Sequence, residues 1–254
     1  MEKDKTIQKV FNLIILDESG SMGAIEKQAV SGLNETLQTI SNAQREHAEQ
    51  QHFVSFVTFN SNGIRTVMNR KQVEGGKALK WTDYQPNACT PLYDAMGQSI
   101  NELKGHVNDE DVVLVTIITD GMENASREFC GKDIKKLVSD MKEKGWVFAY
   151  IGTNQDVDAL ADSMGIRSRM NYEYSQTGAE EMFCMERQCR TAFYDTLSSR
   201  GVDALKKNVN FDFFKSDDEE KKDMADSSTA EADKDDTHQP SGLWSKVKNY
   251  FDEL

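Results

Sequence analysis

Acidic and hydroxyl side chains follow directly after an apolar run near the start of the chain. In the stretch "LIILDESGSMGAIEKQAV", Asp17, Ser19 and Ser21 stand between that run and a helical pattern. A second acid, Asp120, comes directly after another apolar run at 112–119. Open parallel sheets bind ligands at the carboxyl ends of their strands, near the point where strand order reverses. We therefore expect both carboxylates at one edge of a sheet.

The chemistry of these side chains favours a divalent cation. Two buried carboxylates repel each other and take up a proton unless a positive charge lies between them. No Lys, Arg or His lies at 17–22 or at 118–124, the segments that hold the two aspartates. The hydroxyls of Ser19 and Ser21 are hard neutral oxygens, which suit Mg²⁺ together with the carboxylates, although Mn²⁺ and Ca²⁺ remain alternatives. Neutral ligands also leave such an ion attractive to an outside carboxylate.

A further hydroxyl lies in "NACTPLYDAM". Thr90 precedes Pro91 at the start of a helical pattern, in a loop that can reach the same edge of the sheet. Thr90 is also a natural N-cap, with Pro91 as the first helical residue.

The elements that must position these residues follow from hydrophobic periodicity. Short runs rich in Val, Ile and Phe are typical of central strands that are covered on both faces; they lie at 10–16, 53–59, 112–119 and 146–151. Helical patterns lie between them, at 25–40, 92–103 and 134–141. The turn "NSNG" predicts a hairpin to an antiparallel edge strand at 64–68.

The later part of the chain continues this alternation. "NQDVDALADSMGI" predicts a short helix that ends at Gly165, before an edge strand at 167–171. Thr177 and Glu180 form a capping box that opens a last helix. The predicted fold class is α/β, a doubly wound, mostly parallel sheet with one antiparallel edge strand and helices on both faces.

Composition limits the classes of partner. The 254 residues carry a formal net charge of −13, which disfavours sequence-independent binding to nucleic acid or to anionic membranes. The opening "MEKDKTIQKVF" lacks the apolar core of a signal peptide, and no run approaches the roughly 18 apolar residues of a membrane span. We expect a cytoplasmic protein. Its four cysteines lack the paired spacing of a zinc site and are predicted to be reduced thiols.

The C-terminal part has a different composition. The predicted divisions are a lead at 1–8, the main domain at 9–214, a disordered linker at 215–240 and an amphipathic helix at 241–254. The linker holds ten acidic and four basic residues. The apolar face of the helix comprises Leu243, Trp244, Val247, Tyr250 and Phe251. That face is expected to dock on another protein, to fold back on its own domain or to contact a membrane weakly.

Three motifs occur in order after the expected elements: "DESGSM", "TPLYDA" and "ITDGMEN". With them the chain resembles the von Willebrand factor A family, and its metal-ion-dependent adhesion site in particular, over about residues 9–197. The resemblance implies a Rossmann-like fold. It also implies two direct hydroxyl ligands, two carboxylates acting directly or through water, and a threonine that engages when the site is occupied: Ser19, Ser21, Asp17, Asp120 and Thr90.

The resemblance also implies how such a site works. In the family, an acidic side chain of a partner protein fills the remaining coordination position, and water fills it otherwise. Glu18 occupies the variable position of the first motif, where its charge is expected to deepen the acidic field around the ion. The cytosolic character and lone domain resemble bacterial intracellular members, including those encoded near tellurite-resistance genes.

The predicted function is therefore a cytoplasmic, metal-dependent protein interaction module without catalytic activity, with the C-terminal helix as a tethered second contact. One alternative is a metal-dependent phosphotransferase or phosphatase, since such enzymes place a nucleophilic aspartate after the first strand. Ser19 stands where those enzymes have a second aspartate. Another alternative is a non-catalytic subunit of an ATP-driven chelatase or remodelling complex, whose motor would be a separate chain.

Overall fold

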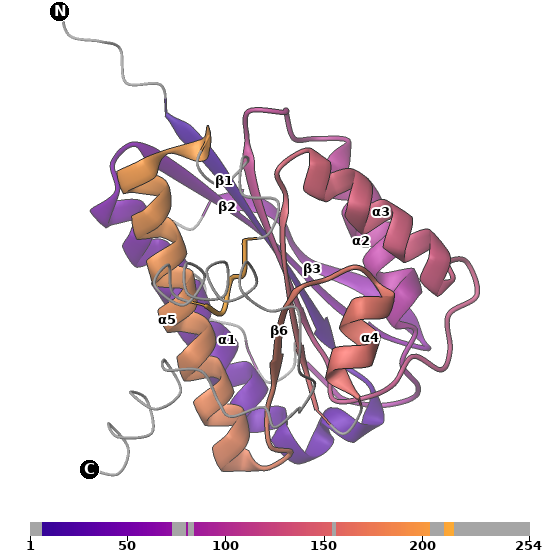
Figure 1. The fold of residues 1–254 in the computed structure, drawn as a ribbon. Helices are drawn as coiled ribbons and strands as arrows, with labels where there is room; N and C mark the ends of the chain where they lie inside the picture. The colour runs from indigo at the N-terminus through magenta and orange to yellow at the C-terminus, as the bar shows by residue number, and fades with distance from the viewer. Residues whose placement is uncertain (1–6, 73–79, 81–83, 154–155, 204–210, 216–254) are drawn as a thin grey trace, which may run out of the picture. The chain divides into compact units, whose positions relative to one another are not determined.

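Strands and helices alternate along the chain in the computed structural model, which describes residues 7–72, 80, 84–153, 156–203 and 211–215 (Figure 1). The strands are β1 (Gln8–Asp17), β2 (Gln50–Asn60), β3 (Gly63–Gln72), β4 (Val112–Ile118), β5 (Val147–Gly152) and β6 (Ser168–Asn171). The helices are the 3₁₀ turn η1 (Gly20–Ile25), α1 (Glu26–Glu46), α2 (Leu92–Lys104), α3 (Gly131–Glu143), α4 (Val157–Ser163) and α5 (Gln176–Arg200).

The six strands form one sheet in the order β3-β2-β1-β4-β5-β6. β1 lies in the centre and pairs in parallel with both β2 and β4. β3 pairs antiparallel with β2 at one edge, as the turn "NSNG" predicts. The predicted α/β class, with a mostly parallel sheet and one antiparallel edge strand, is confirmed. Strand order reverses at β1, so the crevice of a doubly wound sheet is expected between β1 and β4.

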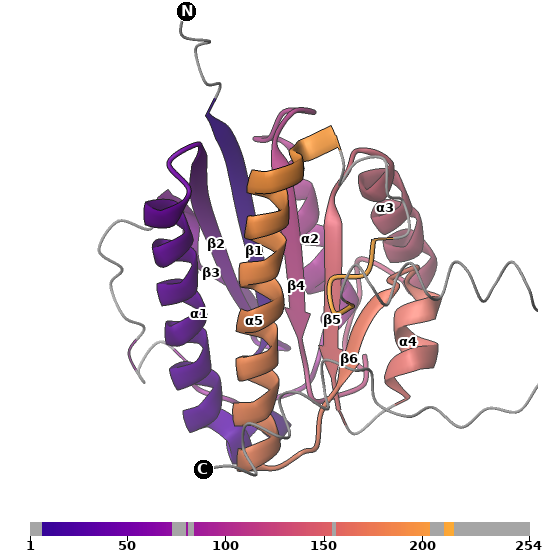
Figure 2. The same cartoon turned by 60° about the vertical axis from the view of Figure 1, so that its left-hand side comes forward.

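Helices cover both faces of the sheet. Figure 2 shows α1 and α5 side by side on one face, with α2, α3 and α4 on the other. Phe11, Leu13 and Ile15 of β1 point to the second face, where they pack into one apolar cluster with α2, α3 and α4. This alternation follows from the two-residue period of a strand, because a central strand must be apolar on both sides.

A buried polar network fixes α5 on the first face. The fully buried guanidinium of Arg190 donates to Glu186 Oε1 from Nε at 2.7 Å. It also donates to Thr116 Oγ1 of β4 at 2.8 Å and to Asn12 Oδ1 of β1 at 3.0 Å. Glu186 and Arg190 are four residues apart, so their ion pair spans one turn of α5. The hydrogen bonds of Arg190 to Thr116 and Asn12 join that helix to the two central strands.

The start of α5 differs from the sequence prediction. Ser175 is the N-cap, and its hydroxyl accepts a hydrogen bond from Gly178 N. The predicted capping box of Thr177 and Glu180 is wrong, because Thr177 already lies within the first helical turn. Ser175 takes the role since its extended backbone aims the hydroxyl at the free amide groups of that turn. Before α4, Asp156 caps the helix by accepting from Ala159 N.

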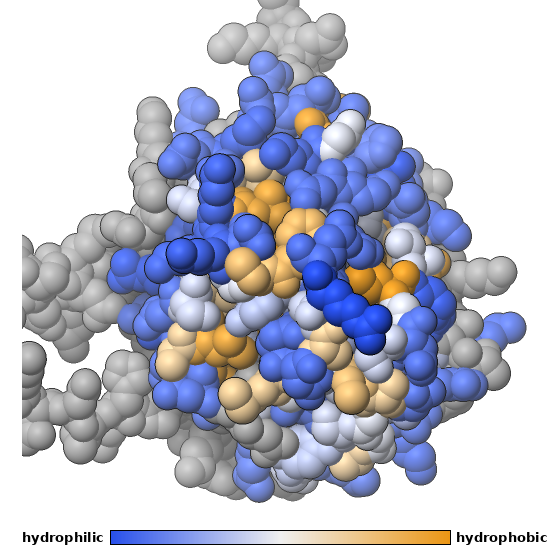
Figure 3. Space-filling view, turned by 90° about the vertical axis from the view of Figure 1, so that its right-hand side faces the viewer, coloured by the Kyte–Doolittle hydropathy of each residue, from blue (hydrophilic) through white to orange (hydrophobic). Residues whose placement is uncertain are grey.

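The side of the molecule that carries α2, α3 and α4 is largely hydrophilic, with small scattered apolar patches (Figure 3). Within the described ranges, no helix is both long enough and apolar enough to cross a membrane. The predicted linker at 215–240, apart from Lys215, and the predicted helix at 241–254 lie outside the described residues.

Candidate functional site

The candidate site lies at the carboxyl ends of β1 and β4. Asp17 is the last residue of β1, and Asp120 follows β4 by two residues. The chain after β1 turns toward α1 and the chain after β4 turns toward α3, which lie on opposite faces of the sheet (Figure 2). The two loops therefore part at this edge, as they do at the switch point of a doubly wound sheet.

A chain of hydrogen bonds joins the two carboxylates through the serines. Asp17 Oδ1 accepts from Ser19 N at 2.7 Å, which closes the turn after β1. The hydroxyls of Ser19 and Ser21 lie 3.2 Å apart, and Ser21 donates to Asp120 Oδ1 at 2.7 Å. Both aspartates and Ser19 are buried, whereas Ser21 is exposed and leaves this cluster open to solvent.

Thr90 joins the same cluster. A β-carbon placed on Gly121 would lie 3.2 Å from Thr90 Oγ1, 3.7 Å from Ser21 Oγ and 3.9 Å from Asp17 Oδ2. These three oxygens therefore surround one small space, which the absence of a side chain at Gly121 leaves unfilled. The structure thus brings all five predicted ligand residues to one edge of the sheet.

The prediction that Thr90 caps α2 is wrong. The helix begins at Leu92 with Pro91 as its N-cap, and no side chain supplies a capping hydrogen bond there. Thr90 is held through its backbone instead: its N–H donates to Asn124 Oδ1 at 2.9 Å, and its carbonyl accepts from Asn124 N at 3.1 Å. This leaves the Thr90 hydroxyl directed at the space beside Gly121.

The electrostatics of the two carboxylates are unfavourable as they stand. Burial raises the pKa of Asp17 from 3.8 to about 6, against the hydrogen bonds from Thr119 and Ser19, and the neighbouring charge of Asp120 adds to the rise. Burial likewise raises the pKa of Asp120, while the hydroxyl of Ser21 and, to a smaller extent, that of nearby Tyr174 lower it. Neither carboxylate forms a salt bridge with a basic residue in the described ranges. A bound cation would relieve this unfavourable charge.

The donor set fits a hard divalent cation. Asp120 Oδ2 is buried, and it has no hydrogen-bond partner among the described residues. A buried acceptor of this kind normally has a partner, so an ion or a water bound to one is the natural occupant of the space beside it. The described ranges contain no group of three or more His, Cys, Asp or Glu side chains able to hold a metal. Any ion here would depend on hydroxyl oxygens, which suit Mg²⁺, Mn²⁺ or Ca²⁺ better than softer metals.

Glu18 does not act as the sequence predicts. Its carboxylate is not an unpaired charge beside the two aspartates, because Arg65 Nη2 donates to its two oxygens at 3.1 and 3.2 Å. Gln85 N also donates to Oε1, at 2.6 Å. The expectation that Glu18 deepens the acidic field is therefore corrected, since its negative charge is paired. The antiparallel position of β3, which carries Arg65, makes this pairing available.

Sequence reasoning missed several residues that support the site. The Thr119 hydroxyl donates to Asp17 Oδ2 at 2.6 Å, so both oxygens of this carboxylate are engaged. Tyr84 Oη donates to the Asp17 carbonyl at 2.6 Å, and Tyr174 Oη donates to the Ser21 carbonyl. Thr119 directly precedes Asp120 in "ITDGMEN", so the sequence could have indicated it. The two tyrosines could not be found in this way, because each is more than 60 residues from its partner.

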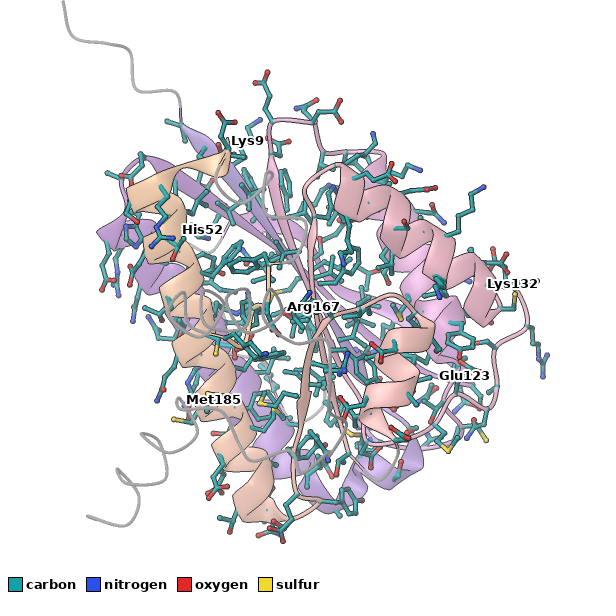
Figure 4. All side chains as sticks on the ribbon, viewed as in Figure 1. Lys9, His52, Glu123, Lys132, Arg167 and Met185 are labelled. Atoms are coloured by element: carbon teal, nitrogen blue, oxygen red, sulfur yellow. The ribbon has the colours of Figure 1, made fainter. Side chains whose placement is uncertain are left out.

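Two more carboxylates stiffen the loops behind the site. Asp94, in the first turn of α2, accepts hydrogen bonds from three successive amide groups of the loop after β4, at residues 127–129. Glu123, which is labelled in Figure 4, belongs to that loop and accepts from Tyr93 N at 2.9 Å. These reciprocal bonds tie the start of α2 to the loop that carries Asp120. Nearby, Met122 is 65% exposed.

Comparison with known proteins identifies the fold. One similar structure is "von Willebrand factor type A from Catenulispora acidiphila", at a TM-score of 0.52 and 15% identity, covering 72% of this chain and 42% of the other. The PilB minor pilin from Streptococcus sanguinis has a TM-score of 0.54 at 11% identity, with 74% and 62% covered. The SpRpn10 VWA domain has a TM-score of 0.51 at 14% identity, with 69% and 94% covered.

At identities of 11–15%, these similarities show the fold alone. This chain spans less than half of the first of these proteins and less than two thirds of the second. No curated protein sequence matches the chain. The family model for the von Willebrand factor type A domain, in contrast, matches residues 13–182, which is more than half of the chain. The chain belongs to the von Willebrand factor type A domain family.

Proposed function

We propose that this protein is a metal-dependent protein interaction module. In this proposal Asp17, Ser19, Ser21, Thr90 and Asp120 form an intact metal-ion-dependent adhesion site, and an Asp or Glu of a partner protein completes the coordination. The bound cation supplies a positive charge that a carboxylate can approach. Domains of this family are commonly interaction modules, and some depend on a metal.

The observation that carries the proposal is the unpartnered, buried Oδ2 of Asp120. It lies in a cluster where two carboxylates with raised pKa values meet three hydroxyl groups. Hydroxyl groups alone do not neutralise two buried negative charges, whereas a divalent cation does. Mg²⁺ is our first choice because it is abundant in cytoplasm, the location that we propose for this chain.

We propose binding rather than catalysis at this edge of the sheet. A phosphotransferase would use the carboxylate after the first strand as a nucleophile with an accessible oxygen. Asp17 is buried, and its two oxygens accept hydrogen bonds from Thr119 Oγ1 and Ser19 N. Those contacts support a role for Asp17 in organising the site. A second contact through the apolar residues of 241–254 remains part of the proposal.

The first test is metal binding. Calorimetric titration of the EDTA-treated full chain with Mg²⁺ and Mn²⁺ is expected to give one site, which Asp17→Ala and Asp120→Ala both abolish. Asp140→Ala is the matched control, because Asp140 is an exposed acid on α3. Equal metal binding by all four proteins would refute the ligand assignment.

The second test is partner binding. Affinity capture from native lysate with Mg²⁺ or with EDTA, using the wild type and the same three variants, is expected to recover a partner only where the metal site is intact. A partner that persists with EDTA and with Asp17→Ala would show that docking uses another surface. A chain that ends near residue 215 would separate the share of the C-terminal part.

A further inference from the structure

The buried acid Glu18 has a place in the fold that the ligand assignment does not explain. It is 7% exposed, yet it holds no position among the proposed ligands. Its Oε1 accepts from the backbone N–H of Gln85 at 2.6 Å and from Arg65 Nη2 at 3.1 Å. Arg65 lies on the edge strand β3, and Gln85 lies five residues before Thr90. Glu18 therefore joins the turn after β1 to the segment that leads to Thr90.

That segment, residues 84–89, belongs to no helix or strand. Its polar groups bond instead to the turn after β1 and to the tip of the β2–β3 hairpin. Besides Gln85 N to Glu18, the contacts are Tyr84 Oη to Asp17 O at 2.6 Å, Asn87 N to Glu18 O at 2.9 Å, Gly20 N to Ala88 O at 3.1 Å and Ser61 N to Cys89 O at 2.9 Å. Two residues hold the segment through both side chain and backbone: Glu18 binds its start, at Gln85 and Asn87, and Ser61 binds its end, where Cys89 N also donates to Ser61 Oγ at 3.1 Å.

The segment needs such anchors because one of its residues is strained. Ala88 has a φ of +65°, in the left-handed region that costs a non-glycine residue about 1 kcal/mol. Such a conformation persists only where the surrounding contacts fix it. Asn124 holds Thr90 from the side of β4 and Ser61 holds Cys89, while Glu18 fixes the start of the segment that contains Ala88.

We propose that Glu18 is a positioning residue of the metal site, whose carboxylate, paired with Arg65, anchors the 84–89 segment so that Thr90 Oγ1 stays within reach of the cation. This inference rests on the proposed metal site and adds to it a residue at the variable position of the first motif. Glu18 itself does not touch the ion. Its effect on metal affinity passes mainly through Thr90.

The test measures Mn²⁺ affinity by calorimetry on the EDTA-treated full chain. Residues that orient metal ligands typically contribute 10- to 100-fold to metal affinity, and we expect a loss of about tenfold for Glu18→Ala. Glu18→Gln keeps an acceptor for Gln85 N but loses the charge that pairs with Arg65, so its loss is expected to be smaller. Glu102→Gln is the matched control, because it breaks a second ion pair from β3, that of Arg70. It should leave the Mn²⁺ affinity unchanged.

A double-mutant cycle with Thr90→Ala separates positioning from other effects. If Glu18 acts through Thr90, Glu18→Ala lowers the affinity in the wild-type background and has little further effect in the Thr90→Ala background. An equal loss of Mn²⁺ affinity in both backgrounds would overturn the proposal, because it would indicate that the charge of Glu18 acts directly on the ion or that the variant is misfolded. Wild-type affinity for Glu18→Ala would overturn it as well. A wild type that does not bind Mn²⁺ would instead refute the metal site on which the inference rests.

Discussion

Replacing Asp17 with asparagine is expected to stabilise the metal-free protein while it removes the metal site. The carboxylate of Asp17 is fully buried, and its pKa is raised from 3.8 to about 6. A raised pKa means that the folded chain binds the proton more tightly than the unfolded chain does. Stability from this group is therefore present below about pH 4 and is lost as the pH rises through about 6. Asparagine has a similar shape and carries no charge to bury.

The size of the effect follows from the shift. About two pKa units correspond to roughly 3 kcal/mol at pH 7.5, where Asp17 is ionised in both states. This is an upper bound, because the amide has one acceptor oxygen, whereas the carboxylate accepts two bonds, from Ser19 N and from the Thr119 hydroxyl. For a domain of this size, 3 kcal/mol corresponds to a rise of roughly 6–12 °C in Tm. Near pH 4 the expected difference falls below about 1 kcal/mol.

The assay is chemical and thermal unfolding of the EDTA-treated wild type and Asp17→Asn at pH 4 and pH 7.5. Asp140→Asn on α3 controls for the general loss of one acid. Adding Mg²⁺ at 100 times its Kd should raise the wild-type stability by about 2.7 kcal/mol and leave Asp17→Asn unchanged. If the metal-free variant is no more stable than the wild type at pH 7.5, or if its gain is the same at both pH values, the burial argument is refuted.

Three further predictions concern the proposed metal site and the buried ion pair of α5. Mn²⁺ affinity should fall about tenfold per pH unit below pH 6, as protons compete for Asp17, and titrations at pH 7.5, 6 and 5 check this. Gly121→Ala should weaken Mn²⁺ binding at least several-fold, since its new methyl group would lie 3.2 Å from Thr90 Oγ1, while thermal unfolding with EDTA stays close to wild type. Arg190→Met should lower the unfolding free energy by about 3–5 kcal/mol, because it leaves Glu186 as an unpaired buried charge, and denaturant unfolding measures it.

The strands and the mainly parallel sheet with its antiparallel edge strand could be predicted because they follow from local patterns. A central strand that is covered on both faces needs a continuous apolar run, and β1 and β4 have one. The turn "NSNG" fixes the antiparallel partner of β2 in the same local way. The two acids could be placed at one edge because each follows such a run directly. These inferences needed no knowledge of how distant segments meet.

The supporting contacts could not be predicted, since they join residues far apart in the chain. Glu18 and Gln85 are 67 residues apart, and nothing near Glu18 indicates an arginine on the edge strand. Arg190 and Glu186 have the four-residue spacing of an ordinary exposed ion pair. Their burial depends on the close approach of α5 to the sheet, which periodicity does not specify. Thr90 failed as a predicted N-cap for a similar reason, because Asn124 of another loop fixes its backbone.

The arrangement of charges gives a reason why stability and binding would be linked at the proposed metal site. Two buried carboxylates balance the charge of one divalent cation, so a loaded site is neutral overall, while hydroxyl ligands add no further negative charge. An outside carboxylate can then approach the ion without crossing a net negative field, although the whole chain has a charge of −13. The pairing of Glu18 with Arg65 serves the same balance, because an unpaired acid at this position would repel that carboxylate. A partner would therefore distinguish the loaded site, which accepts an acid, from the metal-free site, which repels one.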